Sequence, residues 1–276
     1  MHITGVAAGE GKGWSKGRSA ENDPRIARNA AAKRGLRYVR RVPLEEDRRV
    51  RYGRAAALEW SPRLAYAVGL AATDGCLSRD GRHINFTSAD EELVSNFLRS
   101  IGRDVHYGRY VTRIGGIVYR VDFSDVLLWQ WFFAAGLTPA KSLTLGALRV
   151  PPEYLLECAR GLMEGDGGIA NFTHAATKNA YPNYRYERIV VAFTSASRPH
   201  LDWLRVQLEP YAGGLGWITV TRRTDRRNAM NSLRYGKRGC LRVLPLLYRD
   251  PTVPRLTRKW QIWDSYVRRH CADGGT

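Results

Sequence analysis

The chain has 276 residues, with 44 Lys or Arg against 26 Asp or Glu, and therefore a net charge of +18. This length permits one large domain or two small ones, and an apolar fraction of 44% excludes a wholly disordered chain. The longest apolar stretch, around residues 64–72, is too short to cross a bilayer, and the first residues do not resemble a signal peptide. The four cysteines form no Cys-x-x-Cys pair, so we expect a reducing, intracellular setting and no secretion.

The positive charge indicates a polyanionic partner, because each Lys or Arg near a phosphate releases condensed counterions. Residues 1–58 alone hold 14 basic and 6 acidic side chains, which sets this segment apart as a basic arm. Within it, residues 22–35 place Asp23 at the N-cap, Pro24 at the first helical position and a glycine after the end, which predicts a short helix. This helix and the residues around Trp14 resemble the small DNA-binding modules attached to mobile-element nucleases. The resemblance implies DNA contacts for Lys16, Arg18, Arg25 and Arg28, whereas composition alone also allows a flexible basic tail.

From about residue 59, the same series of sequence motifs occurs twice, in the same order each time. A helical pattern that ends in Asp-Gly runs over residues 64–75 and returns over residues 156–167. Each copy is followed by Phe-Thr-Ser-Ala and an amphipathic helical pattern, and each closes with a segment around a lysine, Lys141 or Lys259. We therefore predict a duplicated unit, with halves at residues 59–150 and 151–270 and a tail at residues 271–276.

Two hairpins are predicted in the first half. Asp80-Gly81 is a two-residue turn signal that pairs Leu77 with Ile84 on a buried face. The opposite face then carries Ser78, His83 and Asn85. Gly115-Gly116 is a second such signal, and a two-residue turn there gathers three arginines on one face of the ribbon, opposite a core face. Their like charges repel unless an anion lies against them, and the three are Arg109, Arg113 and Arg120.

The second half shows the same alternation. Its core face is predicted from Ile189, Val191 and Phe193, with Arg188 on the opposite face. Residues 222–228 form a strongly basic turn between two predicted strands. This turn adds Arg222, Arg226 and Arg227 to the basic residues that are candidates for contacts with a polyanion.

Each copy of the helical pattern ends in an aspartate, Asp74 in the first and Asp166 in the second. Small residues precede both and permit close approach of two helix backbones, namely Gly69, Ala72, Gly161 and Gly165. If the two helices pack together, the carboxylates lie side by side at helix C-termini, where the helix dipoles are also negative. A divalent cation relieves this repulsion, so the pattern predicts a metal site.

Residues 67–75 and 159–167 resemble the nine-residue motif of the LAGLIDADG homing endonucleases, and the downstream landmarks extend the similarity over residues 59–270. The resemblance implies an α+β fold of tandem pseudo-symmetric αββαββα repeats. It implies a monomer whose motif helices form the interface between the halves, over a saddle-shaped antiparallel sheet that sits on DNA. It also implies Mg²⁺- or Mn²⁺-dependent hydrolysis of both strands of double-stranded DNA across a minor groove, leaving 3′ overhangs. Ala72 and Glu164 depart from the motif where an Asp is frequent, while the final aspartate is present in both copies.

Carried over by residue, the resemblance assigns metal binding to Asp74 and Asp166, helped by the main-chain carbonyls of Thr73 and Gly165. It places Lys141 and Lys259 near the scissile phosphates, although capping a helix end is also a common role of such a lysine. Base and backbone contacts fall to the polar residues of the ribbons and the basic turn, namely Ser78, His83, Asn85, Arg109, Arg113, Arg120, Arg188, Arg222, Arg226 and Arg227.

Three functions fit these residues. Retention of both aspartates favours a site-specific double-strand DNA endonuclease from a mobile element such as an intron. A maturase that binds its host intron RNA on the same scaffold is the second. A DNA-binding regulator that has lost cleavage is the third, but such a protein has no need of two apposed carboxylates. We expect the protein in the cytoplasm, or in the organelle or nucleoid that holds its DNA.

Overall fold

The computed structural model describes residues 19, 21–33, 58–175, 185–222 and 228–271, in two compact units, residues 1–45 and 46–276. In the first unit, helix α1 (Pro24–Lys33) begins at the predicted residue. The Asp23 carboxylate caps its first turn by accepting a hydrogen bond from the Arg25 backbone amide at 2.9 Å. Lys16 and Arg18 lie outside the described residues, and the predicted end of the basic arm at residue 58 stays a prediction.

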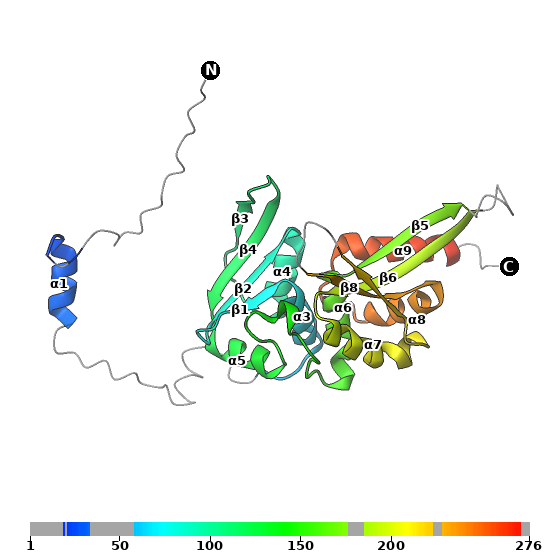
Figure 1. Ribbon diagram of the computed structural model, residues 1–276, viewed down its shortest axis with the longest axis horizontal. Helices are drawn as coiled ribbons and strands as arrows, with labels where there is room; N and C mark the ends of the chain where they lie inside the picture. The colour runs from blue at the N-terminus through cyan, green and yellow to red at the C-terminus, as the bar shows by residue number, and fades with distance from the viewer. Residues whose placement is uncertain (1–18, 20, 34–57, 176–184, 223–227, 272–276) are drawn as a thin grey trace, which may run out of the picture. The chain divides into compact units, whose positions relative to one another are not determined.

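The second unit contains the two predicted αββαββα repeats, coloured from cyan to red in Figure 1. The first repeat consists of α3 (Pro62–Thr73), β1 (Gly75–Leu77), β2 (His83–Ser88), α4 (Glu91–Ser100), β3 (Gly108–Val111), β4 (Ile117–Ser124) and α5 (Val126–Ala134). The second consists of α6 (Leu155–Glu164), β5 (Gly168–Ala175), β6 (Arg185–Ser195), α7 (Arg198–Ala212), β7 (Trp217–Thr221), β8 (Met230–Tyr235) and α8 (Lys237–Leu247). The 3-10 turns η2 (Lys141–Leu143) and η3 (Pro152–Tyr154) lie between the repeats, and α9 (Thr257–Cys271) follows the second.

Each repeat forms its own four-stranded antiparallel sheet, with the order β1-β2-β4-β3 in the first and β5-β6-β8-β7 in the second. Every strand of one sheet therefore has a counterpart at the same place in the other. The predicted α+β fold of tandem αββαββα repeats is confirmed. None of the helices in the described part of the chain is both long and apolar enough to span a membrane.

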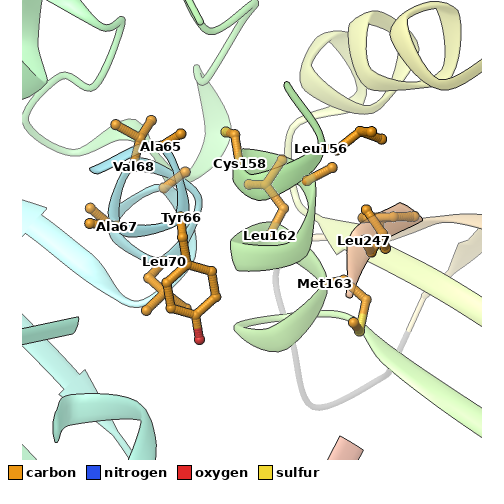
Figure 2. Packing of buried hydrophobic residues seen from close by; sticks show 14 of the residues in the cluster. Ala65, Tyr66, Ala67, Val68, Leu70, Leu156, Cys158, Leu162, Met163 and Leu247 are labelled. Carbon is orange, nitrogen blue, oxygen red and sulfur yellow. The ribbon is translucent and has the colours of Figure 1, made fainter. Parts of the chain in front are cut away.

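Helices α3 and α6 pack directly against each other between the two sheets (Figure 1), and apolar side chains surround the pair (Figure 2). The closest approach is at two glycines. A Cβ built on Gly69 would lie 2.8 Å from the Gly161 Cα, and a Cβ on Gly161 would lie 2.9 Å from the Gly69 Cα. Since real Cβ atoms do not approach other atoms so closely, only glycine permits this packing. The predicted close contact of the two helices is confirmed.

The inner hairpins have the predicted faces. Leu77 lies opposite Ile84 and both are buried, although the chain turns through the longer segment Arg79–Arg82 rather than through two residues. In the second sheet, the alternating core residues Ile189, Val191 and Phe193 are all buried. In each sheet, we call the face that bears these buried residues the core face and the opposite one the open face.

The outer hairpin of the first half differs from the prediction. The backbone amide of Thr112 donates to the carbonyl of Gly116, so the turn contains three residues and Gly115 takes the left-handed conformation. Val111 consequently lies opposite Ile117. An odd shift in register moves each side chain to the other face. The predicted row of three arginines is therefore wrong: Arg120 lies on the open face with Asn85 and Asp122, while Arg109 lies on the core face, opposite Tyr119, where it is exposed.

Candidate active site and nucleic-acid interface

The packed helices bring their two aspartates together at one end of the pair. Asp74 is the C-cap of α3, and its backbone amide donates to the Leu70 carbonyl at 2.9 Å. Asp166 follows Gly165, the C-cap of α6. A Cβ on Gly165 would lie 2.6 Å from the Thr73 Cβ, so the two helix ends are also in close contact. This local geometry places both carboxylates at the junction of the helices with strands β1 and β5.

Both carboxyl groups have perturbed acidities. Burial raises the pKa of Asp74 from its ordinary 3.8 to about 7, and the negative charge of Asp166 adds to the increase. Burial also raises the pKa of Asp166, while Lys141 and Lys259 oppose that change. Asp166 is more exposed to solvent than Asp74, so water stabilises its ionised form better. Two neighbouring acids whose pKa values are both raised are typical of a functional site, and a bound cation would favour their ionised forms.

The lysine that closes each repeat, Lys141 in the first and Lys259 in the second, is buried and binds main-chain carbonyls. The Lys141 ammonium donates to the carbonyl of Gly75, directly after Asp74. The Lys259 ammonium donates to four carbonyls around the end of α6, at 2.6 Å to Glu164, 2.8 Å to Gly167, 3.0 Å to Met163 and 3.2 Å to Gly165. Lys259 thus caps the C-terminal end of α6, and Lys141 binds the main chain just beyond the end of α3.

The charges of the lysines act across the interface between α3 and α6, which we call the helical seam. Lys259 of the second half lowers the pKa of Asp74 more than Lys141 does, whereas Lys141 of the first half has the larger effect on Asp166. Each aspartate is therefore stabilised most by the lysine of the other repeat. Burial in turn lowers the pKa of Lys259 to about 8. A change in one half therefore alters the ionisation of the acid in the other.

Glu164, one of the two residues that depart from the motif, is fully buried beside the seam. Its carboxylate accepts hydrogen bonds from the Tyr66 hydroxyl of α3 and from the Leu256 backbone amide at 2.9 Å. Burial raises the pKa of Glu164, which these hydrogen bonds and Arg160 counteract. Glu164 ties α6 to α3 and to the segment that leads into α9, and it does not reach the paired aspartates through any described hydrogen bond.

The donors at the seam suit a hard divalent cation. Mg²⁺ is commonly bound through one or two carboxylates with substrate phosphates and water, rather than by a cage of protein ligands. Asp74 and Asp166 supply such a pair, and no group of three His, Cys, Asp or Glu side chains within the described ranges offers an alternative. Of the two predicted carbonyl ligands, that of Gly165 already accepts a hydrogen bond from Lys259.

Four of the predicted recognition residues of the first half share the open face of its sheet or the loop beside it, namely Ser78, His83, Asn85 and Arg120. Three of these side chains are held by nearby carboxylates. The Asp122 carboxylate accepts hydrogen bonds from Arg120 at 2.5 Å and from Asn85 at 2.7 Å, while the His83 ring pairs with Asp80. This open face is therefore a polar surface on which Asn85, Arg120 and His83 each have a carboxylate partner.

The other recognition candidates are distributed more widely. Arg113 is exposed in the turn after β3, Arg188 is exposed on the open face of the second sheet, and Arg222 is exposed just after β7. Arg226 and Arg227 lie outside the described residues. In the separate first unit, Arg25 forms an ion pair with Asp23 and Arg28 is exposed.

Sequence reasoning missed Arg234. It lies opposite Ala192 and Trp217 on the open face of the second sheet, next to the fully buried Leu233. No ion pair involves Arg234 within the described ranges, in contrast to Arg120 of the first sheet. The alternation of Leu233 with Arg234 was a signal that could have identified it.

The protein thus consists of two αββαββα repeats, with a pair of acids at the interface of helices α3 and α6 and a polar face on the first sheet. No protein-family model and no curated protein sequence matches the chain. Among solved structures, the LAGLIDADG homing endonuclease I-LtrWI bound to target DNA is similar at 9% identity, covering 76% of this chain and 91% of that one, with a TM-score of 0.51. The meganuclease I-AabMI bound to uncleaved DNA shares 12% identity, covering 78% and 92%, with a TM-score of 0.47. The chain has the fold of the LAGLIDADG homing endonucleases.

Proposed function

We propose that this protein is a site-specific, metal-dependent endonuclease that hydrolyses both strands of double-stranded DNA. The observation that carries the proposal is the meeting of Asp74 and Asp166 at the ends of two packed helices, with both pKa values raised. The net charge of +18 and the polar open face of the first sheet support a duplex as the partner. I-LtrWI, which shares the fold, was solved on its target DNA.

Asp74 and Asp166 would hold Mg²⁺ or Mn²⁺, with remaining positions open to phosphate oxygens and water. Such a cation supplies an activated water and stabilises the negative charge that develops on a phosphate in hydrolysis. The two aspartates fix where a scissile phosphate lies relative to the helix ends. Lys141 and Lys259 hold the main chain that bears these acids, and their charges lower the pKa values of both acids and so favour the ionised forms, which makes them positioning residues. Cleavage across a minor groove would leave 3′ overhangs.

The test is selection of cleaved sites from a randomised DNA library with Mg²⁺ present. We expect one extended site to be enriched by the wild-type chain, and neither Asp74→Asn nor Asp166→Asn to cut it. Both variants should still bind the site in EDTA, which separates loss of chemistry from loss of folding. Cleavage by either variant at the wild-type rate would refute the assignment. Specific DNA binding without any cleavage by wild-type protein would favour the regulator, and preferential binding of intron RNA would favour the maturase.

A further inference from the structure

The open faces of the two sheets can be compared position by position, because both sheets have the same strand order. Cys76 lies opposite Asn85 in the first hairpin, and Gly168 lies opposite Ala192 in the second. Two residues further along each hairpin, the Ser78 backbone amide donates a hydrogen bond to the His83 carbonyl, so these two residues face each other. The equivalent pair in the second half is Ala170 opposite Val190. The matched sets are therefore Cys76, Ser78, His83 and Asn85 in the first half and Gly168, Ala170, Val190 and Ala192 in the second.

The two sets differ in chemistry throughout. Ser78, His83 and Asn85 offer hydrogen-bond donors and acceptors, whereas their counterparts in the second half offer only small apolar groups. These small residues line a hollow of about 310 Å³ on the open face of the second sheet. Asp166 lines the same hollow, so it adjoins the paired acids, and Phe172, 40% exposed, lines it further along β5. The hydroxyls of Thr194 and Ser232, 3.0 Å apart, also line the hollow, so it is a mostly apolar depression in which an apolar group of a ligand can contact the sheet.

The neighbouring side chains differ as well. In the first sheet, the position opposite Asn85 is Asp122, which binds Asn85 and Arg120. In the second sheet, the matching position opposite Ala192 is Arg234, which also lines the hollow. The second half thus presents small apolar side chains next to the Thr194–Ser232 hydroxyl pair and an exposed cation, where the first half presents a hydrogen-bonded network with a carboxylate.

We infer that the second half reads the 5-methyl groups of thymine in the target duplex, while the first half reads hydrogen-bonding edges of bases. This inference rests on the proposed function. The thymine methyl is the apolar group that a base pair presents in the major groove. Small side chains at Ala170, Val190 and Ala192 leave room for it, and Arg234 at the border suits a guanine edge or a phosphate. Because uracil lacks this methyl, the same surface disfavours RNA.

The experiment measures equilibrium binding, in EDTA, of the wild-type chain to its selected site with deoxyuridine replacing thymidine in one half-site at a time. The replacement removes only methyl groups. We expect about a fourfold loss of affinity for each methyl contacted in one half-site, and no loss in the other. Equal binding of thymidine and deoxyuridine in both half-sites, with specific binding otherwise intact, would overturn the inference and leave the proposed function standing. Failure to bind any specific site would instead overturn the proposed function.

Two matched variants assign the effect to the second half. Ala192→Asn installs the residue that the first half has at the same position and should abolish the deoxyuridine penalty. Asn85→Ala, the reciprocal change, should leave that penalty in place while it alters base preference in the other half-site. Val190→Thr is nearly isosteric and should reduce the penalty even if Ala192→Asn fails to fold, as judged by thermal unfolding. A penalty that persists unchanged in folded Ala192→Asn and Val190→Thr would refute the assignment.

Discussion

Replacing Asp74 by asparagine should make the metal-free protein more stable at high pH. The folded chain binds the Asp74 proton more tightly than the unfolded chain, because burial raises the pKa of this carboxyl from 3.8 to about 7. The wild-type protein therefore loses stability as the pH rises between these two values, and the loss is complete above about pH 7. Asparagine cannot ionise and avoids this loss.

The size of the effect follows from the shift in pKa. At about 1.36 kcal/mol for each pKa unit, the free energy of unfolding of Asp74→Asn should exceed that of wild type by at most about 4 kcal/mol at pH 8. Because the Asp74 side chain keeps some contact with water, we expect about 2–4 kcal/mol. At pH 4 the carboxyl is protonated in the folded state, so the two proteins should differ little.

The assay is urea-induced unfolding at pH 4 and at pH 8 with EDTA present, followed by the fluorescence of the eight tryptophans. Asp166→Asn is the matched control and should gain less, because Asp166 is more exposed. Adding Mg²⁺ at pH 8 should stabilise the wild type more than Asp74→Asn, since only the wild type keeps both carboxylates. The same stability difference at pH 4 and pH 8, or a loss of stability at pH 8, would refute the argument from burial and repulsion.

Three further outcomes are expected. Gly69→Ala should lower stability by about 1–3 kcal/mol and impair cleavage, since its methyl group overlaps α6. The control Gly146→Ala, with open space around it, should change neither. Equal thermal unfolding midpoints for the two variants would contradict this expectation. Lys259→Met should move the pH midpoint of cleavage to higher pH, because Lys259 lowers the pKa of Asp74, and a midpoint that stays in place in pH–rate profiles would refute the coupling. Deleting residues 1–58 should weaken DNA binding and flatten its salt dependence. An unchanged slope of log affinity against log salt concentration would show that the arm makes no phosphate contacts.

The sequence by itself determined the duplication, the fold class and the two acids. Asp74 and Asp166 end helical patterns that repeat with small residues at Gly69 and Gly161, and backbone sterics alone make those glycines suited to close helix packing. Alternation also predicted the core face of β6 correctly, because side chains of a strand point to opposite faces whatever the strand pairs with.

Only the tertiary structure decided how strands pair and which charges face each other. The register between β3 and β4 depends on the position and length of the turn at residues 113–115, which places Arg109 and Arg120 on opposite faces. The crosswise effect of Lys259 on Asp74 depends on where two distant helix ends meet. The apolar hollow beside Arg234 arises from four strand positions that local patterns do not connect. Periodicity specifies the faces within one element, whereas register and electrostatic pairing depend on distances between elements that only packing fixes.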